Sequence, residues 1–143
     1  SVLHLYETLG LWRKADYLET HFAQTVNEYH HLLIMEELGG DERYADRFFA
    51  QHVAFFYYWL TCLIYVVSPC MAYNLSEQIE EHAYQTYDEF LKNHGTSLSL
   101  EKAPVVASDY YGDVSSLHDV FTRIRDDEGE HVKEMQECQI DLA

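Results

Sequence analysis

Residues 117–138, LHDVFTRIRDDEGEHVKEMQEC, carry the pattern that decides the fold. Val120 and Ile124 recur at the spacing of one helix face, and Glu128 and His131 continue the same line. A Glu-x-x-His pair places both side chains on one face of a helix, one turn apart. A carboxylate on an inward face is costly unless it is paired or bound to a metal. The stretch therefore indicates a helix that presents a metal-ligating pair to the interior.

Glu28 and His31 repeat this spacing in a second helix-compatible stretch. Fifteen Glu and nine His in 143 residues give about one such match by chance, so both pairs could be ordinary solvated helix pairs. Context favours the metal interpretation of the Glu28 pair, because Val26, Leu32 and Leu33 surround it at helical spacing. We therefore predict that both pairs face inward.

Glu80 is a third candidate ligand, because Ile79 and Ala83 place it beside an apolar helix face. A surface carboxylate beside Glu77 and Glu81 is the ordinary alternative. Two helices that give one Glu each and two that give Glu-x-x-His form the ligand set of ferritin-like di-iron bundles. Oxygen and imidazole ligands suit iron or manganese better than structural zinc. The sequence supplies three Glu and two His of that set.

The composition restricts the class of protein. The chain carries 25 Asp+Glu against 9 Lys+Arg, a formal charge of −16, so it lacks the basic face that a nucleic-acid binder needs. The same shortage of cations leaves few partners for buried carboxylates, which favours a bound metal. Hydrophobic residues make up 48%, which argues against disorder. Cys62, Cys70 and Cys138 form no C-x-x-C pair, so no disulfide framework is expected.

Helical periodicity covers most of the chain, and residues 1–143 are predicted to form a single all-α domain, most simply a helical bundle. Gly39–Gly40 and Ser68–Pro69 are expected to end two helices, and residues 94–104 to form a loop. The expected helices are Ser1–Leu9, Lys14–Leu38, Glu42–Val67, Ala72–Asn93 and Asp113–Cys138.

The run Val53–Val67, VAFFYYWLTCLIYVV, has no charged residue and is apolar or aromatic on every face. Such a helix is either fully buried or in lipid. The run is shorter than the roughly 20 residues that span a bilayer, and its aromatic residues favour the membrane interface. Arg43 and Arg47 precede it and could meet lipid headgroups. The segment alone is compatible with a central core helix and with a helix that lies within one leaflet, as in a monotopic protein.

Three stretches that cover nearly the whole chain carry a family resemblance. They are SVLHLYETLGLWRKADYLETHFAQTVNEYHHLLIMEELGG, DRFFAQHVAFFYYWLTCLIYVVSPCMAYNLSEQIEEHAYQTYDEFL and LHDVFTRIRDDEGEHVKEMQEC. The sequence closely resembles the alternative oxidases, and most closely their plastid terminal oxidase branch. The resemblance implies a ferritin-like di-iron four-helix bundle with an interfacial membrane helix at residues 47–67. It also implies an enzyme that oxidises quinol and reduces O2 to water without pumping protons.

The resemblance also implies which residues hold the two irons. The family's N-E-x-x-H element matches residues 27–31, its mid-chain glutamate lies in IEEHAY at 79–84, and its D-E-x-x-H element matches residues 127–131. The implied metal ligands are Glu28, His31, Glu80, Glu128 and His131.

Further roles follow from the same match. Tyr87 corresponds to the family's tyrosine near the iron centre, often given a redox role, although an ordinary packing tyrosine is the simpler alternative. Asp127 and Asn27 are expected to orient a ligating side chain, with plain surface charge as the alternative for Asp127. Among the remaining histidines, His82 is expected to face the quinol.

Two features depart from the family pattern. The family's first ligating glutamate lies in an L-E-T motif that is expected before Ser1, since the LET at residues 18–20 falls inside the next helix. We therefore expect most of the first bundle helix, one ligand and part of the quinol pocket to be missing, and iron binding by this chain to be poor. The segment from Tyr110 to Leu117 is also shorter than in plastid members.

The resulting prediction is a quinol oxidase that transfers electrons from plastoquinol or ubiquinol to O2 at a di-iron centre. The expected partners are a membrane quinol, O2, one membrane leaflet and, by analogy only, a second copy in a homodimer. A thylakoid or other photosynthetic membrane is implied before the mitochondrial inner membrane. The alternatives are a non-catalytic ferritin-like metal-binding bundle and a helical interaction protein without metal. The run Val53–Val67 discriminates, because a soluble storage protein has no need of it.

Overall fold

Helices make up nearly all of the regular structure. The computed structural model of the chain describes residues 1–11 and 14–143. Its helices are α1 (Val2–Thr8), α2 (Ala15–Glu37), α3 (Tyr44–Val67), α4 (Pro69–Leu98), α5 (Val105–Tyr111) and α6 (Leu117–Leu142). These described residues contain no strand, only an isolated bridge between Lys102 and Ser116. The all-α prediction is confirmed.

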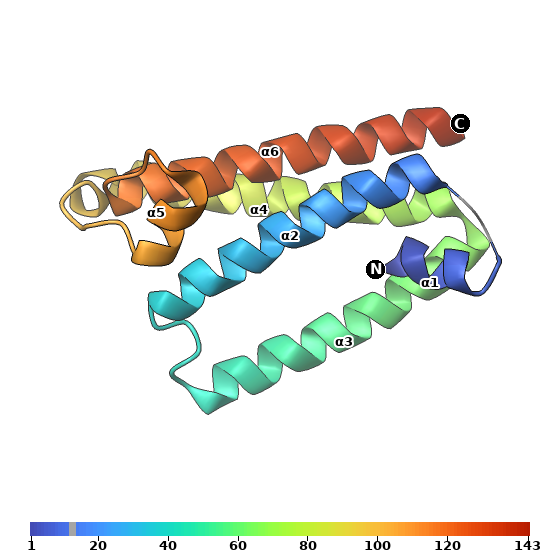
Figure 1. Ribbon diagram of the computed structural model, residues 1–143, viewed down its shortest axis with the longest axis horizontal. Coiled ribbons are helices and arrows are strands. Elements are labelled where there is room, and N and C mark those ends of the chain that lie inside the picture. Colours follow the sequence, from blue (N-terminus) through green and yellow to red (C-terminus); the bar gives the residue numbers. More distant parts are fainter. Residues whose placement is uncertain (12–13) are drawn as a thin grey trace.

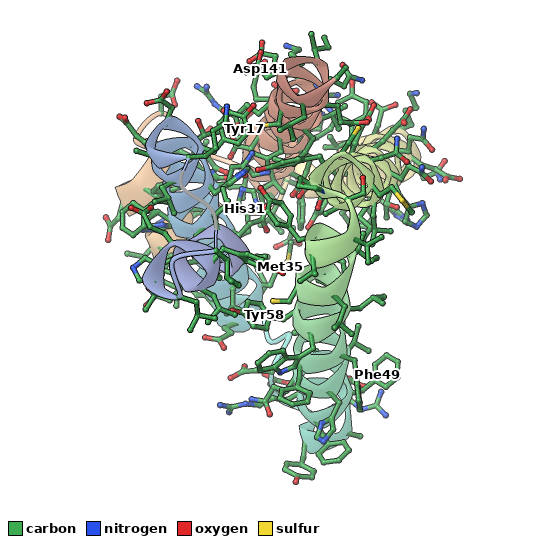
Figure 2. The ribbon with its side chains drawn as sticks, turned by 90° about the vertical axis from the view of Figure 1, so that its right-hand side faces the viewer. Tyr17, His31, Met35, Phe49, Tyr58 and Asp141 are labelled. Atoms are coloured by element: carbon green, nitrogen blue, oxygen red, sulfur yellow. The ribbon has the colours of Figure 1, made fainter. Side chains whose placement is uncertain are left out.

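The helices α2, α4 and α6 are grouped together, and α3 stands apart from them (Figure 1). The pair α4 and α6 has the most extensive contact, and α2 also contacts α6. Helices α2 and α4 run in the same direction, and α6 runs in the opposite direction (Figure 1). Helix α3 contacts α4, and its N-terminal end projects away from the other helices (Figure 2). Three long helices are therefore placed to bring side chains together.

Helix α3 presents its large apolar side chains to the outside. Phe56 is 68% exposed and Leu63 is 66% exposed, and only 17% of the most apolar 18-residue window is buried. The interpretation as a central core helix is therefore wrong. The helix as folded has 24 residues, so it is longer than the apolar run and is long and apolar enough to cross a membrane. An exposed helix that is apolar on every face needs lipid or a protein partner to cover it.

Helix α4 is longer than the sequence predicts at both ends. Ser68 caps it by accepting a hydrogen bond from the Met71 N–H at 3.3 Å, and Pro69 is its first residue. Proline suits this position because its missing N–H would have no helical partner there. The prediction of a loop from residue 94 is wrong, since the helix continues to Leu98. Gly95 lies within α4 beside α6, where a Cβ would make an ordinary van der Waals contact with the His118 ring at 3.5 Å.

Helix α6 begins later than predicted, and α5 has no counterpart in the prediction. A reciprocal cap between Ser116 and Asp119 starts α6 at Leu117 rather than at Asp113. The backbone N–H groups of Val105 and Val106, at the start of α5, donate to the Glu37 carboxylate at 3.1 and 2.9 Å. Glu37 lies 68 residues before Val105 in the sequence, so no local sequence pattern predicts this start of α5.

The interior has two apolar clusters with a polar layer between them. Along the inward face of α6, Val120 and Ile124 belong to one cluster, and Met135 and Cys138 belong to the other. The buried residues between them on α6 are Glu128 and His131. The second cluster is rich in buried tyrosine: Tyr6, Tyr17, Tyr65 and Tyr73. The candidate metal ligands therefore lie in the middle of the bundle.

Candidate metal centre

Four predicted ligands from three helices converge on one point. Glu28 from α2, Glu80 from α4, and Glu128 and His131 from α6 each offer a ligand atom, and these atoms all lie within 4.8 Å of one another. They come together because each side chain lies on the inward face of its helix, at the same height along the bundle. The structure thus brings these four side chains together.

The two histidines aim their Nδ1 atoms at the carboxylates. The His131 Nδ1 lies 3.3 Å from Glu28 and 3.6 Å from Glu80, and the His31 Nδ1 lies 3.4 Å from Glu128. Both Nδ1 atoms are buried and have no hydrogen-bond partner. A buried polar atom needs a partner, and either a proton shared with the carboxylates or a metal ion between them and the nitrogen would supply one.

Asp127 fixes which nitrogen of His31 faces the centre. Its Oδ2 accepts hydrogen bonds from His31 Nε2 at 3.0 Å, from Tyr111 OH at 2.6 Å and from Asn27 Nδ2 at 2.8 Å. Because the carboxylate only accepts, Nε2 carries the proton and Nδ1 of the neutral ring has the free lone pair. A carboxylate behind a histidine is the usual support of a metal ligand.

Without a metal, the site concentrates charge and shifts its pKa values. Burial opposes protonation of His31, yet the nearby carboxylates of Asp127, Glu128 and Glu28 raise its pKa to about 11. The pKa of His131 is raised to about 10 in the same way, by Glu28 and Glu80 against the effect of burial. Burial raises the pKa of Glu128 to about 7, with Glu80 and Glu28 adding to it and His31 opposing it. Protons thus stand in for the positive charge that a metal would supply.

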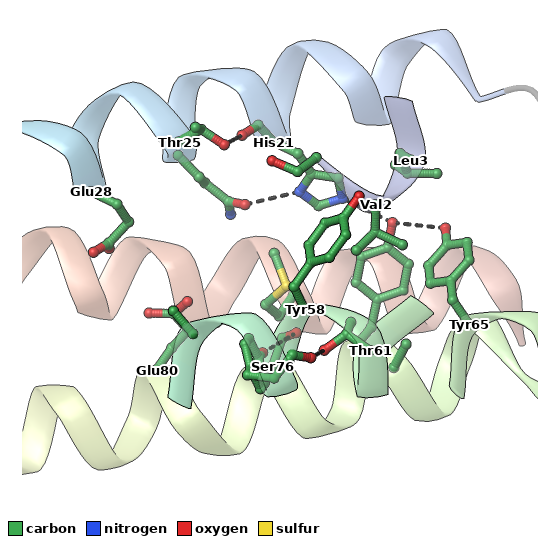
Figure 3. Close-up of a pocket in the computed structure, with 17 residues that line it drawn as sticks. Val2, Leu3, His21, Thr25, Glu28, Tyr58, Thr61, Tyr65, Ser76 and Glu80 are labelled. Carbon is green, nitrogen blue, oxygen red and sulfur yellow. Dashed lines mark hydrogen bonds between the residues drawn. The ribbon is translucent and has the colours of Figure 1, made fainter. Parts of the chain in front are cut away.

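The centre opens on one side. Glu128 and His131 are almost fully buried, whereas the Glu28 side chain is 48% exposed and the Glu80 side chain 25% exposed. Glu28 and Glu80 line a cavity of about 650 Å³ and lie toward one end of it, with Tyr65 toward the other (Figure 3). A metal held here would therefore meet a cavity on the Glu28 and Glu80 side, as a catalytic site requires.

The donor set fits a metal of the iron or manganese type. It consists of carboxylate oxygens and imidazole nitrogens with no thiolate, which is the preference of these ions rather than of structural zinc. The buried Nδ1 atoms of His31 and His131 lie 3.4 and 3.3 Å from carboxylates, so a metal could bind between the nitrogens and the oxygens. These residues could hold a metal.

The remaining predicted residues are placed unequally. Asn27 joins the Asp127 network and also donates to Tyr110 OH at 3.0 Å. Tyr87 is half-buried, and burial raises its pKa to about 12, with the charges of Glu128 and Glu28 adding to it. His82 is exposed on α4, two residues beyond Glu80, and does not line the cavity. The structure thus places Asn27 and Tyr87 near the candidate metal centre and His82 away from it.

Sequence reasoning missed two groups. Tyr111 donates the shortest hydrogen bond that Asp127 receives, from a helix that had not been predicted. His21 and Tyr73 form a second polar pair, at 2.8 Å between Nε2 and OH, inside the tyrosine-rich cluster. The spacing of seven residues from His21 to Glu28 and from Tyr73 to Glu80 was a usable signal, because it repeats one helix face.

The fold and the site together define a helical bundle with a carboxylate–histidine cluster that could hold a metal. Comparison with known proteins makes this specific: the alternative oxidase family model matches residues 1–139, and the chain belongs to the alternative oxidase family.

Two similar relatives come from Arabidopsis thaliana. The chain is 52% identical over 160 residues to "Ubiquinol oxidase 4, chloroplastic/chromoplastic", covering 97% of this chain and 46% of the relative. It is 30% identical to "Ubiquinol oxidase 2, mitochondrial", covering 91% of this chain and 37% of the relative. The chain therefore spans less than half the length of these relatives. No solved structure matches.

Proposed function

We propose that the complete protein is a quinol oxidase, which passes electrons from a membrane quinol to O2 and yields quinone and water at a di-iron centre. The family membership and the names of the relatives support the class of reaction. The observation that carries the proposal is the convergence of three carboxylates, one from each of three helices, on the buried Nδ1 atoms of His31 and His131. An ordinary helical interaction protein has no need of three carboxylates gathered at one point, where their like charges repel one another unless protons or a metal offset them.

The five residues that would hold the irons are Glu28, His31, Glu80, Glu128 and His131. When bound, an iron pair supplies the electron transfer to O2 that side chains cannot perform. The chain itself supplies the orientation of the ligands: Asp127 holds the His31 ring through Nε2, and Asn27 and Tyr111 hold Asp127. Tyr87 is proposed as a redox-active tyrosine, since it is half-buried within the field of Glu28 and Glu128.

The proposed membrane association is monotopic, with α3 lying within one leaflet. Charged and polar residues interrupt the first turns of α3, so its continuous apolar part is the run Val53–Val67. That run is shorter than the hydrocarbon core of a bilayer, and its aromatic side chains suit the interface. A quinol with a long apolar tail could reach such a protein from the lipid without entering water. His82 stays the candidate for a residue that faces the quinol.

A chloroplast or other plastid membrane is the proposed location, because the more similar of the two Arabidopsis relatives is the chloroplastic/chromoplastic one. Plastoquinol is then the nearest candidate quinol, with ubiquinol as the alternative. A homodimer is proposed through an apolar stripe on α2 that the monomer leaves exposed. The stripe consists of Phe22, Val26, Tyr29 and Leu32.

The deciding experiment loads the complete protein with Fe2+ under anaerobic conditions and then measures bound iron and quinol-dependent O2 uptake. Two irons per chain together with O2 uptake support the proposal. Two irons without O2 uptake in the presence of quinol indicate a non-catalytic metal-binding bundle instead. Absence of bound iron contradicts both metal functions. The exposed α3 already favours the oxidase, because a soluble storage bundle has no use for an unburied apolar helix.

A further inference from the structure

The tyrosine-rich cluster contains a hydrogen-bonded chain that the proposed reaction does not use. Tyr65 OH lies 3.2 Å from Tyr73 OH, and Tyr73 OH lies 2.8 Å from His21 Nε2. His21 Nδ1 lies 2.9 Å from Gln24 Oε1, and Gln24 Nε2 donates to the Glu134 carboxylate. Tyr73 is 4% exposed, so this series of hydrogen bonds begins deep in the protein and leads to the partly exposed Glu134.

Gln24 and Glu134 determine which group donates and which accepts in each of these hydrogen bonds. The Glu134 carboxylate only accepts, so the Gln24 amide must direct its NH2 group toward Glu134 and its oxygen toward His21. His21 Nδ1 therefore carries the proton, and Nε2 has the free lone pair. Tyr73 consequently donates its phenolic proton to Nε2 of His21, and Tyr65 donates to the oxygen of Tyr73.

The resting protonation state agrees with this direction. Burial lowers the pKa of His21, so the imidazole is neutral at neutral pH and its Nε2 is a proton acceptor. Burial also raises the pKa of Tyr73, so the phenol keeps its proton until an electron is removed. The negative charge of Glu134 lies at the far end of the chain, where it favours positive charge on the imidazole.

The pair lies on the same helix faces as the metal ligands. His21 precedes Glu28 by seven residues on α2, and Tyr73 precedes Glu80 by seven residues on α4. Seven residues are two helical turns, or about 10 Å along the axis. All four side chains line the same cavity, and His21 lies between Tyr65 and the two glutamates in the view of Figure 3. The pair therefore forms the next layer of the bundle beside the candidate metal centre.

We propose that Tyr73 is a second redox-active tyrosine of this protein, which gives its phenolic proton to Nε2 of His21 when it loses an electron. The inference rests on the proposed function for its physiological oxidant, a one-electron oxidant formed when O2 is reduced at the neighbouring centre. It assigns the Tyr73–His21 pair a role in holding an oxidising equivalent away from the metal.

The step balances in atoms and charge. One electron leaves Tyr73 for the oxidant, the O–H bond of Tyr73 breaks, and an N–H bond forms on His21. The products are a neutral tyrosyl radical and an imidazolium. In the reverse step, an electron that derives from the quinol reduces the radical, and the proton returns from His21 to the phenolic oxygen.

Tyr6 provides a matched comparison within the same cluster. It is buried and its ring centroid lies 5.3 Å from that of Tyr65, but its OH donates to the backbone carbonyl of Cys62 at 2.6 Å. A carbonyl cannot take up the phenolic proton at neutral pH, so oxidation of Tyr6 would leave a proton without a base. The difference between Tyr73 and Tyr6 is thus the base and not the burial.

The test uses metal-free protein, so that it does not depend on iron loading or oxidase activity. A ruthenium photosensitiser with a sacrificial acceptor oxidises the folded chain by one electron, and electron paramagnetic resonance detects the tyrosyl radical in frozen samples. We expect a radical signal that is lost in Tyr73→Phe, reduced in His21→Gln and unchanged in Tyr6→Phe. Circular dichroism checks that each variant is folded.

A measurement on the unmutated protein covers the case in which a variant does not fold. Electron–nuclear double resonance after exchange into D2O should show two exchangeable hydrogens that are hydrogen-bonded to the radical oxygen, one from Nε2–H of His21 and one from the OH of Tyr65. The proposal is overturned if Tyr73→Phe keeps the signal, if Tyr6→Phe or Tyr17→Phe removes it instead, or if the radical has no exchangeable hydrogen bond. If the complete protein forms the Tyr73 radical but binds no iron, the oxidase proposal is contradicted and the Tyr73–His21 proposal stands. If it oxidises quinol but forms no Tyr73 radical, the Tyr73–His21 proposal is contradicted and the oxidase proposal stands.

Discussion

Asp127 accepts a hydrogen bond from Nε2 of His31 at 3.0 Å, on the side of the ring opposite the atom that faces the carboxylates. This relationship ties the orientation of a candidate ligand to a residue that would not itself touch the metal. We expect Asp127→Ala to weaken iron binding by about 10- to 100-fold, because the ring loses its fixed proton position and its anchor. Iron titration of the metal-free protein measures this. The neighbouring Asp126→Ala is the control, since Asp126 is exposed and pairs with Arg125; equal affinity losses in both variants would contradict the assigned role.

Glu80 is the candidate ligand that α4 contributes, and its loss should remove function without removing the fold. We expect Glu80→Ala in the complete protein to lose bound iron and O2 uptake while the protein stays attached to membranes. Attachment is expected to persist because α3 carries the apolar surface and Glu80 lies on another helix. Glu81→Ala is the matched control, because Glu81 is exposed and its carboxylate accepts from Gln85 on the surface. Near-normal activity of the Glu80 variant would refute the ligand assignment.

Metal binding should release protons at neutral pH. The raised pKa values, about 11 for His31 and about 10 for His131, mean that both rings are protonated in the metal-free protein at pH 7. Ligation through Nδ1 needs neutral rings, so about two protons should leave per filled centre, and affinity should rise with pH up to the region of these pKa values. Calorimetric titrations in buffers of different ionisation enthalpy give the number of protons. Binding that is independent of buffer and pH would show that the rings are not ligands.

Glu37 should set the position of α5 and, through it, of Tyr111. Its carboxylate accepts the N–H groups of Val105 and Val106 at the start of that helix. Loss of such a cap costs about 0.5–2 kcal/mol, so Glu37→Ala is expected to lower the free energy of unfolding by that amount. Chemical denaturation measures it, with exposed Glu19→Ala on the same helix as the control. A stability equal to that of the control variant would mean that the contact does not hold α5.

The outward face of α3 should determine membrane attachment. We expect the double substitution Phe56→Glu and Leu63→Glu to release the complete protein from lipid vesicles, because each change places a charge where an apolar side chain would meet lipid. Vesicle co-sedimentation measures the bound fraction. Leu100→Glu is the control, since Leu100 is 84% exposed at a position away from α3. Release by the control alone, or by neither variant, would show that α3 does not attach the protein.

The sequence by itself determined the helical class and the inward faces. Three-residue spacing predicts that each Glu-x-x-His pair shares a helix face. Glu28, Glu80, Glu128 and His131 were found from that spacing, from apolar neighbours at helical spacing and from the family motifs that they form. The helix periods are local properties of the chain, so they can be read without knowledge of the partners.

Only the tertiary structure decided which faces meet and what each atom does there. The exposure of α3 depends on how far it diverges from α2, and the protonated nitrogen of His31 depends on Asp127, which is 96 residues away. The docking of α5 on Glu37 and the pairing of His21 with Tyr73 are likewise long-range contacts. Hydrogen-bond partners from different helices are set by packing, and no local period encodes them.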